Sequence, residues 1–305
     1  MSMFEPAYLT LLRSGELRER ALTAFEQMRN CNLCANYCHV ERIAYPHKAR
    51  CHTGQNAVVC SVAPHHGEER PISGRRGSGT IFFGWCNLAC VFCQNWEISH
   101  AGEGREVDNA ILANQMLSLQ AAGCHNINFV SASHVIPQIL AAVEIAAAKG
   151  LSLPLVFNSG GYDSPEGLAL LDGVVDIYMP DMKFADSTIA SEYVGVSDYA
   201  EVNQAAVREM HRQVGDLVLS ETGIARRGLI IRHLVLPDGL AGTEKVLSFI
   251  ANELSQETYI NLMKQYRPCY HASRYTGLDR KPGRHDFAHA RQLAKDFGLL
   301  RLDCY

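Results

Sequence analysis

The chain has 305 residues, 47% of them hydrophobic and 20% charged, a balance typical of a globular protein with a sizeable core. Its net charge of −4 gives no sign of a strongly basic face, so nucleic acid is not an expected partner. No apolar run reaches about 18 residues and the first residues lack a signal-peptide core, which predicts a cytoplasmic protein without membrane association.

Residues 6–30 are predicted to form a helix, because apolar residues recur at roughly helical spacing with one interruption at Gly15. Residues 31–79 contain many Cys, His, Gly and Arg residues and show little periodicity. This composition predicts a loop-rich module that something other than an apolar core holds together. Near its end, Glu68 and Glu69 are expected to lie in a solvated loop, with contact to a substrate as the alternative.

From residue 80 onward, apolar strands alternate with helices. The expected strands are Thr80–Phe83, Asn126–Ser131, Leu155–Asn158, Asp176–Met179, Leu229–Val235 and Tyr259–Met263. The expected helices lie near Asp108–Ala122, Val135–Lys149, Ser164–Leu171, Glu201–Val214 and Thr243–Leu254, with Asp108, Ser164 and Thr243 as N-caps. Such alternation indicates a parallel sheet with crossover helices.

Six strands are too few to close an eight-stranded barrel. The predicted fold is therefore α/β: a partial (β/α)6 TIM-type barrel over residues 80–305, preceded by an N-terminal helix and a Cys-rich metal-binding extension over residues 1–79. A doubly wound open sheet is the alternative. In a barrel, the side chains that carry chemistry are expected at the C-terminal ends of the strands.

Eleven cysteines in a reducing compartment indicate metal ligation rather than disulfides. In the N-terminal extension, two cysteines on a tight turn, a third nearby and a fourth after a loop can surround a metal, whose binding can supply folding free energy. Four thiolates suit zinc and a second iron–sulfur cluster equally, and unligated structural cysteines are the alternative. These four residues are Cys31, Cys34, Cys38 and Cys51, with Cys60, His39, His47 and His52 as substitutes. The scattered Cys124, Cys269 and Cys304 are expected to be ordinary small apolar residues.

A second group, Cys86, Cys90 and Cys93, lies in the loop that directly follows the first barrel strand. Three thiolates within these eight residues can bind one face of a four-iron cluster. Because such a cluster takes four ligands, three protein thiolates leave one iron open to a small molecule. The alternative is a zinc site, which needs a fourth ligand such as His100.

The spacing C-x3-C-x2-C, with the aromatic Phe92 before the last cysteine, resembles the signature of the radical S-adenosylmethionine (SAM) superfamily. The resemblance implies a [4Fe-4S] cluster whose open iron is chelated by the amino and carboxylate groups of SAM. One electron from the cluster would cleave the sulfonium to give a 5′-deoxyadenosyl radical, while the protein orients the reactants and excludes solvent. Phe92 would pack near the adenine.

The segment DMKFAD, from Asp181 to Asp186, resembles the D-L-K-x-x-D segment of glycyl-radical-enzyme activases. In an extended segment, Asp181 and Lys183 point to the same side. The resemblance implies that Lys183 binds the SAM carboxylate and that Asp181 binds a ribose or a substrate amide. An ion pair at a strand end is the alternative.

Nearly the whole chain is similar to pyruvate formate-lyase activating enzyme-like proteins, through segments such as GTIFFG (79–84), GCHNINFV (123–130), DIYMPD (176–181) and QYRP (265–268). Activases carry a Gly-Gly-Glu motif after the second strand, whose backbone carbonyls meet the SAM ammonium. The equivalent stretch here is Ser131-Ala132-Ser133-His134, so the carboxylate is lost and His134 stands in its place. The backbone of Ala132, Ser133 and His134 remains an expected SAM contact, with helix capping by His134 as the alternative.

Two further strand ends are candidate parts of the site. Asn158, followed by Ser159-Gly160-Gly161, can present backbone groups to SAM, with a simple glycine turn as the alternative. Arg232 and His233 point to opposite faces of the fifth strand, so only one of them can line the barrel interior. The sequence does not decide between them.

Two enzyme functions fit these features, both of them radical SAM oxidoreductase chemistry. The first is abstraction of hydrogen from a backbone glycine of a separate glycyl radical enzyme. The second is a reaction on a peptide or small molecule, with the N-terminal cysteines as an auxiliary cluster. A non-catalytic iron–sulfur electron carrier or sensor is a third hypothesis, but it does not explain Asp181 and Lys183 at a strand end. The resemblance also implies a flavodoxin or ferredoxin-type electron donor.

Overall fold

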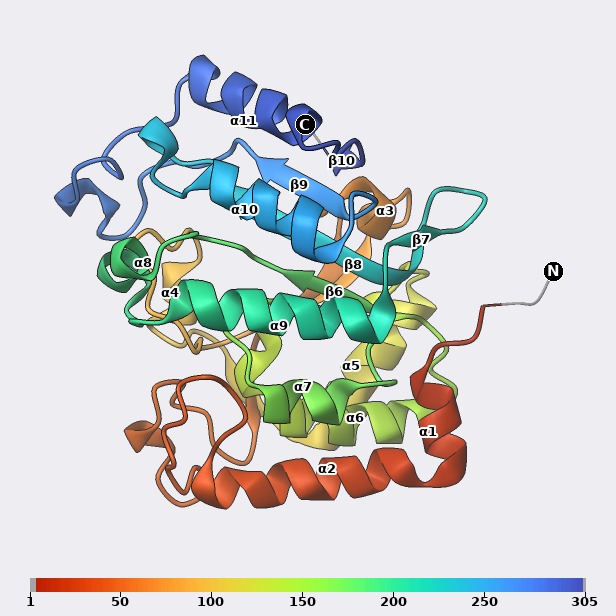
Figure 1. Cartoon of the computed structure of the whole chain (residues 1–305). Helices are drawn as coiled ribbons and strands as arrows, with labels where there is room; N and C mark the ends of the chain where they lie inside the picture. Colours follow the sequence, from red (N-terminus) through yellow and green to blue (C-terminus); the bar gives the residue numbers. More distant parts are fainter. Residues whose placement is uncertain (1–3, 304–305) are drawn as a thin grey trace.

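The structure, a computed structural model, describes residues 4–303 (Figure 1). It begins with two helices, α1 (Tyr8–Ser14) and α2 (Glu16–Gln27). They are separated by Gly15, whose φ of 82° lies in the left-handed region that favours glycine. The helix predicted over residues 6–30 is therefore confirmed, together with its interruption. Cys304 lies outside the described residues.

A ten-stranded sheet forms the centre of the molecule, in the order β10-β9-β8-β6-β5-β4-β2-β1-β3, with β7 paired to β8. The strands from β10 through β2 in this order are parallel, whereas β1 and β3 are antiparallel additions at one edge. Every predicted strand is present, and the α/β partial barrel is confirmed. The strands are β1 (Ala57–His65), β2 (Ser78–Phe83), β3 (Arg105–Val107), β4 (Ile127–Val130), β5 (Leu155–Ser159), β6 (Ile177–Pro180), β7 (Val218–Leu219), β8 (Ala225–Leu234), β9 (Tyr259–Met263) and β10 (Leu302–Asp303).

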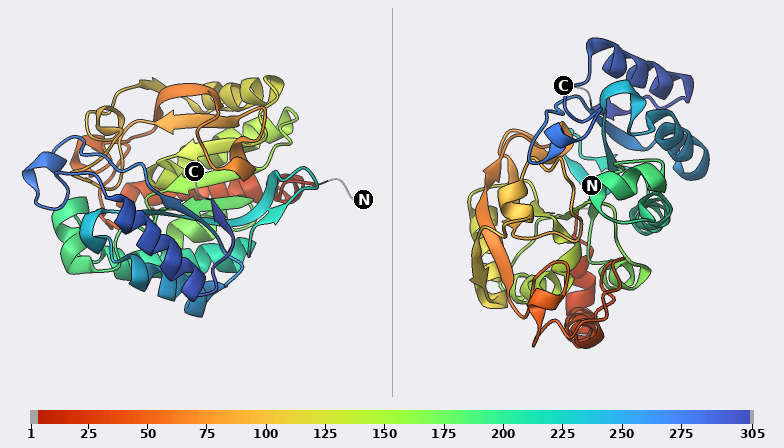
Figure 2. Two further views of the ribbon diagram at one scale, coloured as in Figure 1. Left: turned by 90° about the horizontal axis from the view of Figure 1, so that it is seen from above. Right: turned by 90° about the vertical axis from the view of Figure 1, so that its left-hand side faces the viewer.

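Helices connect the parallel strands and lie along the outer side of the curved sheet (Figure 2). The crossover helices are α5 (Asn109–Ala121), α6 (Ile136–Ala148), α7 (Pro165–Leu171), α9 (Tyr199–Val214) and α10 (Thr243–Phe249), the last continued by a π-helix (Ile250–Leu254). Shorter or later helices are α3 (Arg70–Ser73), α4 (Trp96–Ser99), α8 (Ser187–Val194) and α11 (Arg284–Asp296). Between residues 4 and 303, no helix is long and apolar enough to cross a membrane.

Two of the three predicted N-caps are confirmed. The side chains of Asp108 and Ser164 accept backbone N–H groups from the first turns of α5 and α7. The prediction for Thr243 is wrong, because Gly242 precedes α10 and no side chain caps that helix. The Thr243 hydroxyl is instead 2.9 Å from Nε2 of His233, a buried contact that stabilises the strand–helix packing.

Strand β1 is the main departure from the expected loop over residues 31–79. It pairs antiparallel with β2, with Val59 opposite Phe83 and an irregularity in the register between Val59 and Ser61. Only its first half is buried. The short apolar run therefore becomes a strand because a partner strand is supplied from later in the chain.

One hydrophobic core joins the N-terminal helices to the barrel. Leu17, Ala21 and Ala24 recur at helical spacing on one face of α2 and are buried in the same cluster as residues of α6. The predicted boundary between residues 79 and 80 therefore does not separate two cores. Successive strand residues point to opposite faces, and a second set fills the inside of the barrel. This inner set includes Ile72, Val156, Ile177, Met179 and Ile230.

Candidate functional site

The predicted cluster ligands Cys86, Cys90 and Cys93 lie together on the wall of one cavity of about 210 Å³. Their loop leaves the C-terminal end of β2 through Trp85, whose φ of 67° is unusual for a residue other than glycine. Such backbone strain tends to cluster at functional sites. The other walls come from the C-terminal ends of β4, β5, β6, β8 and β9, and include Ser131, Asn158, Gly160, Asp181, Lys183, Arg232 and Gln265.

Each of the three cysteines has a polar neighbour that fixes its position. The backbone N–H of Leu88 lies 3.4 Å from Sγ of Cys86, and the hydroxyl of Ser99 lies 3.1 Å from Sγ of Cys93. Nε2 of His100 is 3.1 Å from the carbonyl oxygen of Cys90. His100, the predicted fourth zinc ligand, therefore contacts the backbone of the loop.

The three cysteines are half-buried, and the loss of contact with water disfavours the charged forms of two of their thiols. Burial raises the pKa of Cys86 to about 11 and that of Cys90 to about 12, although the charge of Lys183 acts in the opposite direction on both. Thiols must lose their protons to bind a metal. Ligation of a metal at this site would therefore release protons and would be favoured by the nearby cation.

Asp181, Lys183 and Arg232 form a charged network across the cavity wall. Lys183 forms an ion pair with Asp181, and Nε of Arg232 is 2.9 Å from the other Asp181 oxygen. Arg232 also donates to Oδ1 of Asn158 at 2.8 Å. The structure thus places Arg232 toward the barrel interior, whereas His233 is buried on the other face against the Met182 carbonyl.

The network is charged at neutral pH. Burial alone would raise the pKa of Asp181, but Arg232 and Lys183 hold it below its usual value. Burial alone would lower the pKa of Lys183, but the Asp181 carboxylate holds it well above its usual value. The ion pair named as the alternative for these two residues is therefore present, inside the cavity rather than on the surface.

Glu68 and Glu69 were expected in a solvated loop, and this prediction is wrong. Both are buried, with Oε2 of Glu68 3.7 Å from Arg232 and Oε1 of Glu69 accepting from Asn261 at 2.7 Å. Burial raises the pKa of Glu68 to about 7 against the opposing effect of Arg232. No local sequence signal indicates this position, because the closure of the barrel around α3 creates it.

Besides Asp181 and Lys183, two of the predicted SAM-binding residues line the cavity, and the other three do not. Phe92 and Asn158 are on its wall, and Phe92 packs edge to face on Phe184 and Tyr266. Ala132, Ser133 and His134 are buried away from the wall. Their place is taken by Val130 and Ser131, the latter in the left-handed region with a φ of 63°.

His134 is held by the fold rather than presented to a ligand. Its Nε2 is 3.0 Å from the carbonyl oxygen of Gly84, and its own carbonyl accepts from Arg42. Burial, reinforced by the Arg42 charge, lowers the pKa of His134 to about 3, so the ring is neutral. The His134 ring thus makes a structural contact with the β2 loop and does not cap α6, the alternative named for it.

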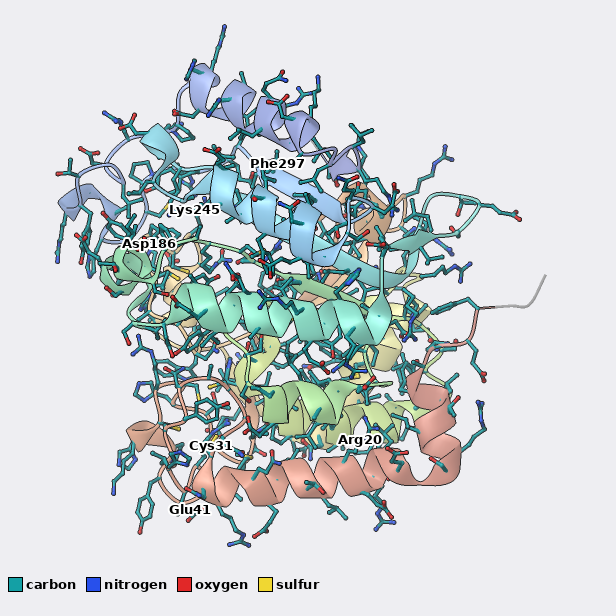
Figure 3. The ribbon with its side chains drawn as sticks, viewed as in Figure 1. Arg20, Cys31, Glu41, Asp186, Lys245 and Phe297 are labelled. Atoms are coloured by element: carbon teal, nitrogen blue, oxygen red, sulfur yellow. The ribbon has the colours of Figure 1, made fainter. Side chains whose placement is uncertain are left out.

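The N-terminal cysteines lie in the loops at the end of α2, where Figure 3 labels Cys31. Cys31, Cys34 and Cys51 are buried and Cys38 is half-buried. Asn36 links this region to the loop that carries Cys86, Cys90 and Cys93. Its Nδ2 is 3.7 Å from Sγ of Cys34 and donates to the Asn87 carbonyl at 2.7 Å. Within residues 4–303, no three His, Cys, Asp or Glu side chains are arranged to hold a single metal ion. The thiolates of a four-iron cluster, in contrast, each bind a different iron.

Fold and site together define an α/β partial barrel with a three-cysteine loop at the C-terminal ends of its strands. No family model matches the chain. The uncharacterized protein MJ0674 of Methanocaldococcus jannaschii is 31% identical over 278 residues, which are 89% of this chain and 76% of that protein. The chain therefore belongs to the family of this archaeal protein.

Two solved structures show remote likeness. TYW1 with a lysine-pyruvate adduct bound has a TM-score of 0.46 and 14% identity, covering 72% of each chain. A radical SAM methyltransferase from Sphaerobacter thermophilus has a TM-score of 0.48 and 13% identity, covering 96% of this chain and 90% of the other.

Proposed function

We propose that the chain is a radical SAM enzyme. The observation that carries the proposal is the cavity that Cys86, Cys90 and Cys93 share with the Asp181–Lys183 ion pair at the C-terminal ends of the parallel strands. Barrel enzymes place their active sites at this end. The spacing of the cysteines and the position of their loop support the same assignment.

The donor set fits a four-iron cluster with one open iron. Three thiols share one cavity, and a backbone N–H and a hydroxyl lie within hydrogen-bond distance of two of the sulfurs. Contacts of this kind tune iron–sulfur clusters. When bound, cluster and SAM would supply a 5′-deoxyadenosyl radical for hydrogen abstraction.

The protein's own groups would bind and orient SAM. Lys183 places a permanent cation beside the cysteines, where it can bind a carboxylate, while Asp181 and Arg232 hold it in place. Asn158, whose Oδ1 accepts from Arg232, is a further polar residue on the cavity wall. Phe92, packed on Phe184, provides an apolar surface for an adenine ring.

The test is SAM cleavage by anaerobically reconstituted protein with a strong one-electron reductant. We expect 5′-deoxyadenosine and methionine, and a cluster spectrum that changes when SAM is added. Replacement of Cys86, Cys90 and Cys93 by Ala should abolish both signals, whereas Cys124→Ala, at a buried cysteine outside the site, should retain them. Absence of deoxyadenosine from protein with a verified full cluster would favour an electron carrier.

The finer proposal is activation of a glycyl radical enzyme by hydrogen abstraction from a backbone glycine, with a flavodoxin or ferredoxin-type protein as the electron donor. It is supported by the resemblance of the DMKFAD segment to activases. The loss of the Gly-Gly-Glu carboxylate favours instead a reaction on another peptide or a small molecule. Electron paramagnetic resonance after mixing with a glycyl radical enzyme separates the two, because only activation leaves a glycyl radical on the partner.

A further inference from the structure

Arg42 is the most deeply buried arginine near the N-terminal cysteines, with 1% of its surface exposed. Its Nε donates to the Thr53 carbonyl at 2.9 Å, one terminal nitrogen donates to the His134 carbonyl at 2.7 Å, and the other lies 3.5 Å from Sγ of Cys31. Arginine stays protonated in proteins. The fold therefore encloses a full positive charge.

A buried charge needs a partner of opposite sign. Carbonyl oxygens carry no net charge, and among the described residues no carboxylate lies within ion-pair distance of Arg42. The group beside the guanidinium that can become an anion is the sulfur of Cys31, 3.5 Å from a terminal nitrogen of Arg42. Among the described residues, the cysteine sulfurs of this module are thus the groups that could supply the missing negative charge.

We propose that Cys31, Cys34, Cys38 and Cys51 hold a second metal centre, and that this negatively charged metal–thiolate group is the partner of Arg42. Four thiolates around one zinc ion, or around a doubly positive four-iron cluster, keep a net negative charge. Either centre would balance the guanidinium. The proposal does not depend on the radical SAM chemistry of the first site.

The backbone around these cysteines supports the proposal independently. Tyr37, His39 and His52 have φ values of 40°, 52° and 46°, in the left-handed region that residues with a Cβ adopt only at a cost. Three such residues within one short module need strong compensation from their surroundings. Metal binding supplies it, because its free energy contributes directly to folding.

The two metals make different demands on the thiols. The four side chains as they stand are not arranged around one point as ligands of a single ion. Zinc would require them to turn inward to tetrahedral ligation. A cluster would take each thiolate on a separate iron.

The experiment uses the full chain with Cys86, Cys90 and Cys93 replaced by Ala, which removes the first site and leaves only the second. Protein purified without oxygen is assayed for metals. We expect about one zinc or about four irons per chain. In this background Cys34→Ser should lower the metal content at least tenfold, whereas the buried but distant Cys124→Ser should not change it. Metal-free protein, or metal that survives Cys34→Ser, would overturn the proposal.

Arg42 is tested in the same background. Arg42→Met should lower the metal occupancy severalfold and Arg42→Lys should restore part of it, because the lysine keeps the charge. Arg29→Met is the matched control, since Arg29 is paired with Glu26 at the surface just before the cysteine module. Unchanged occupancy in Arg42→Met would show that the centre does not serve as the counter-charge.

A measurement on the unaltered protein covers the case in which Cys34→Ser fails to fold. A chelator that binds zinc and iron is added to the purified full chain, and proteolysis within residues 31–60 is followed together with metal release. We expect cleavage in this module to begin as the second metal leaves. Release of all metal without new cleavage would contradict a metal-held module.

Discussion

Lys183 and Arg232 differ in how much of their charge the protein already uses. The nitrogens of Arg232 face Asp181, Asn158 and Glu68. Nζ of Lys183 bonds only to Asp181 among the described residues, so an ammonium with three donors keeps capacity for a ligand. At the residue scale, Lys183 is therefore the group that would bind an anion, and Arg232 is the residue that positions its carboxylate partner.

Lys183→Ala should weaken SAM binding while leaving the fold intact. A hydrogen bond to a charged group contributes roughly 1.5–3 kcal/mol, which corresponds to about a ten- to hundredfold loss of affinity. The measurement is the dissociation constant of SAM on reconstituted protein. Lys149→Ala, at an exposed lysine on the end of α6, is the control. An unchanged constant would leave Lys183 with a purely structural ion pair.

Glu68 should make the stability depend on pH. Its pKa rises from an ordinary 4.5 to about 7 in the folded chain, so the folded state binds more protons between these values. The free energy of unfolding should therefore fall as the pH rises through this window, by roughly 3 kcal/mol at most. Denaturant unfolding at several pH values, compared between the unaltered chain and Glu68→Gln, isolates this contribution. Glu221→Gln, at an exposed position, should leave the pH dependence as it is.

At individual residues, the sequence predicts chemistry best where the spacing is local. Cys86, Cys90 and Cys93 lie on one loop, so their spacing alone brings them to one cavity wall. Glu68 precedes α3, far in sequence from its neighbour Arg232 on β8. Its burial therefore depends on closure of the barrel. A polar run before a strand looks the same whether it lies in solvent or beneath a barrel.

At the element scale, strong periodicity predicts strands and helices to within a few residues. β9 has the predicted bounds, and α5 and α6 differ by one residue at each end. β1 was missed because only its first half is buried, which leaves little alternation to read. It forms a strand because it pairs with β2, and this pairing cannot be predicted from the residues of β1 alone.

The helix α2 should contribute to the stability of the whole barrel. Leu17 of α2 is fully buried in the core shared with the barrel. Leu17→Ala should therefore lower the free energy of unfolding by about 2–5 kcal/mol. Leu22 lies on the same helix with 63% of its surface exposed, and Leu22→Ala should have little effect. Equal effects of the two substitutions in denaturant unfolding would mean that α2 does not pack as described.

At the scale of the whole molecule, a single core predicts a single unit of unfolding. The buried cluster runs from Tyr8 through the barrel strands to Leu299. Elements that share one core should open together, so the slowest amides of α2 and β4 should exchange hydrogen with the same free energy of opening. Native-state hydrogen exchange measures this directly, with the exposed β7 segment as a fast-exchanging reference. If α2 exchanged with a distinctly lower free energy than β4, the N-terminal region would unfold as a separate domain, and the boundary near residue 80 would mark a real unit.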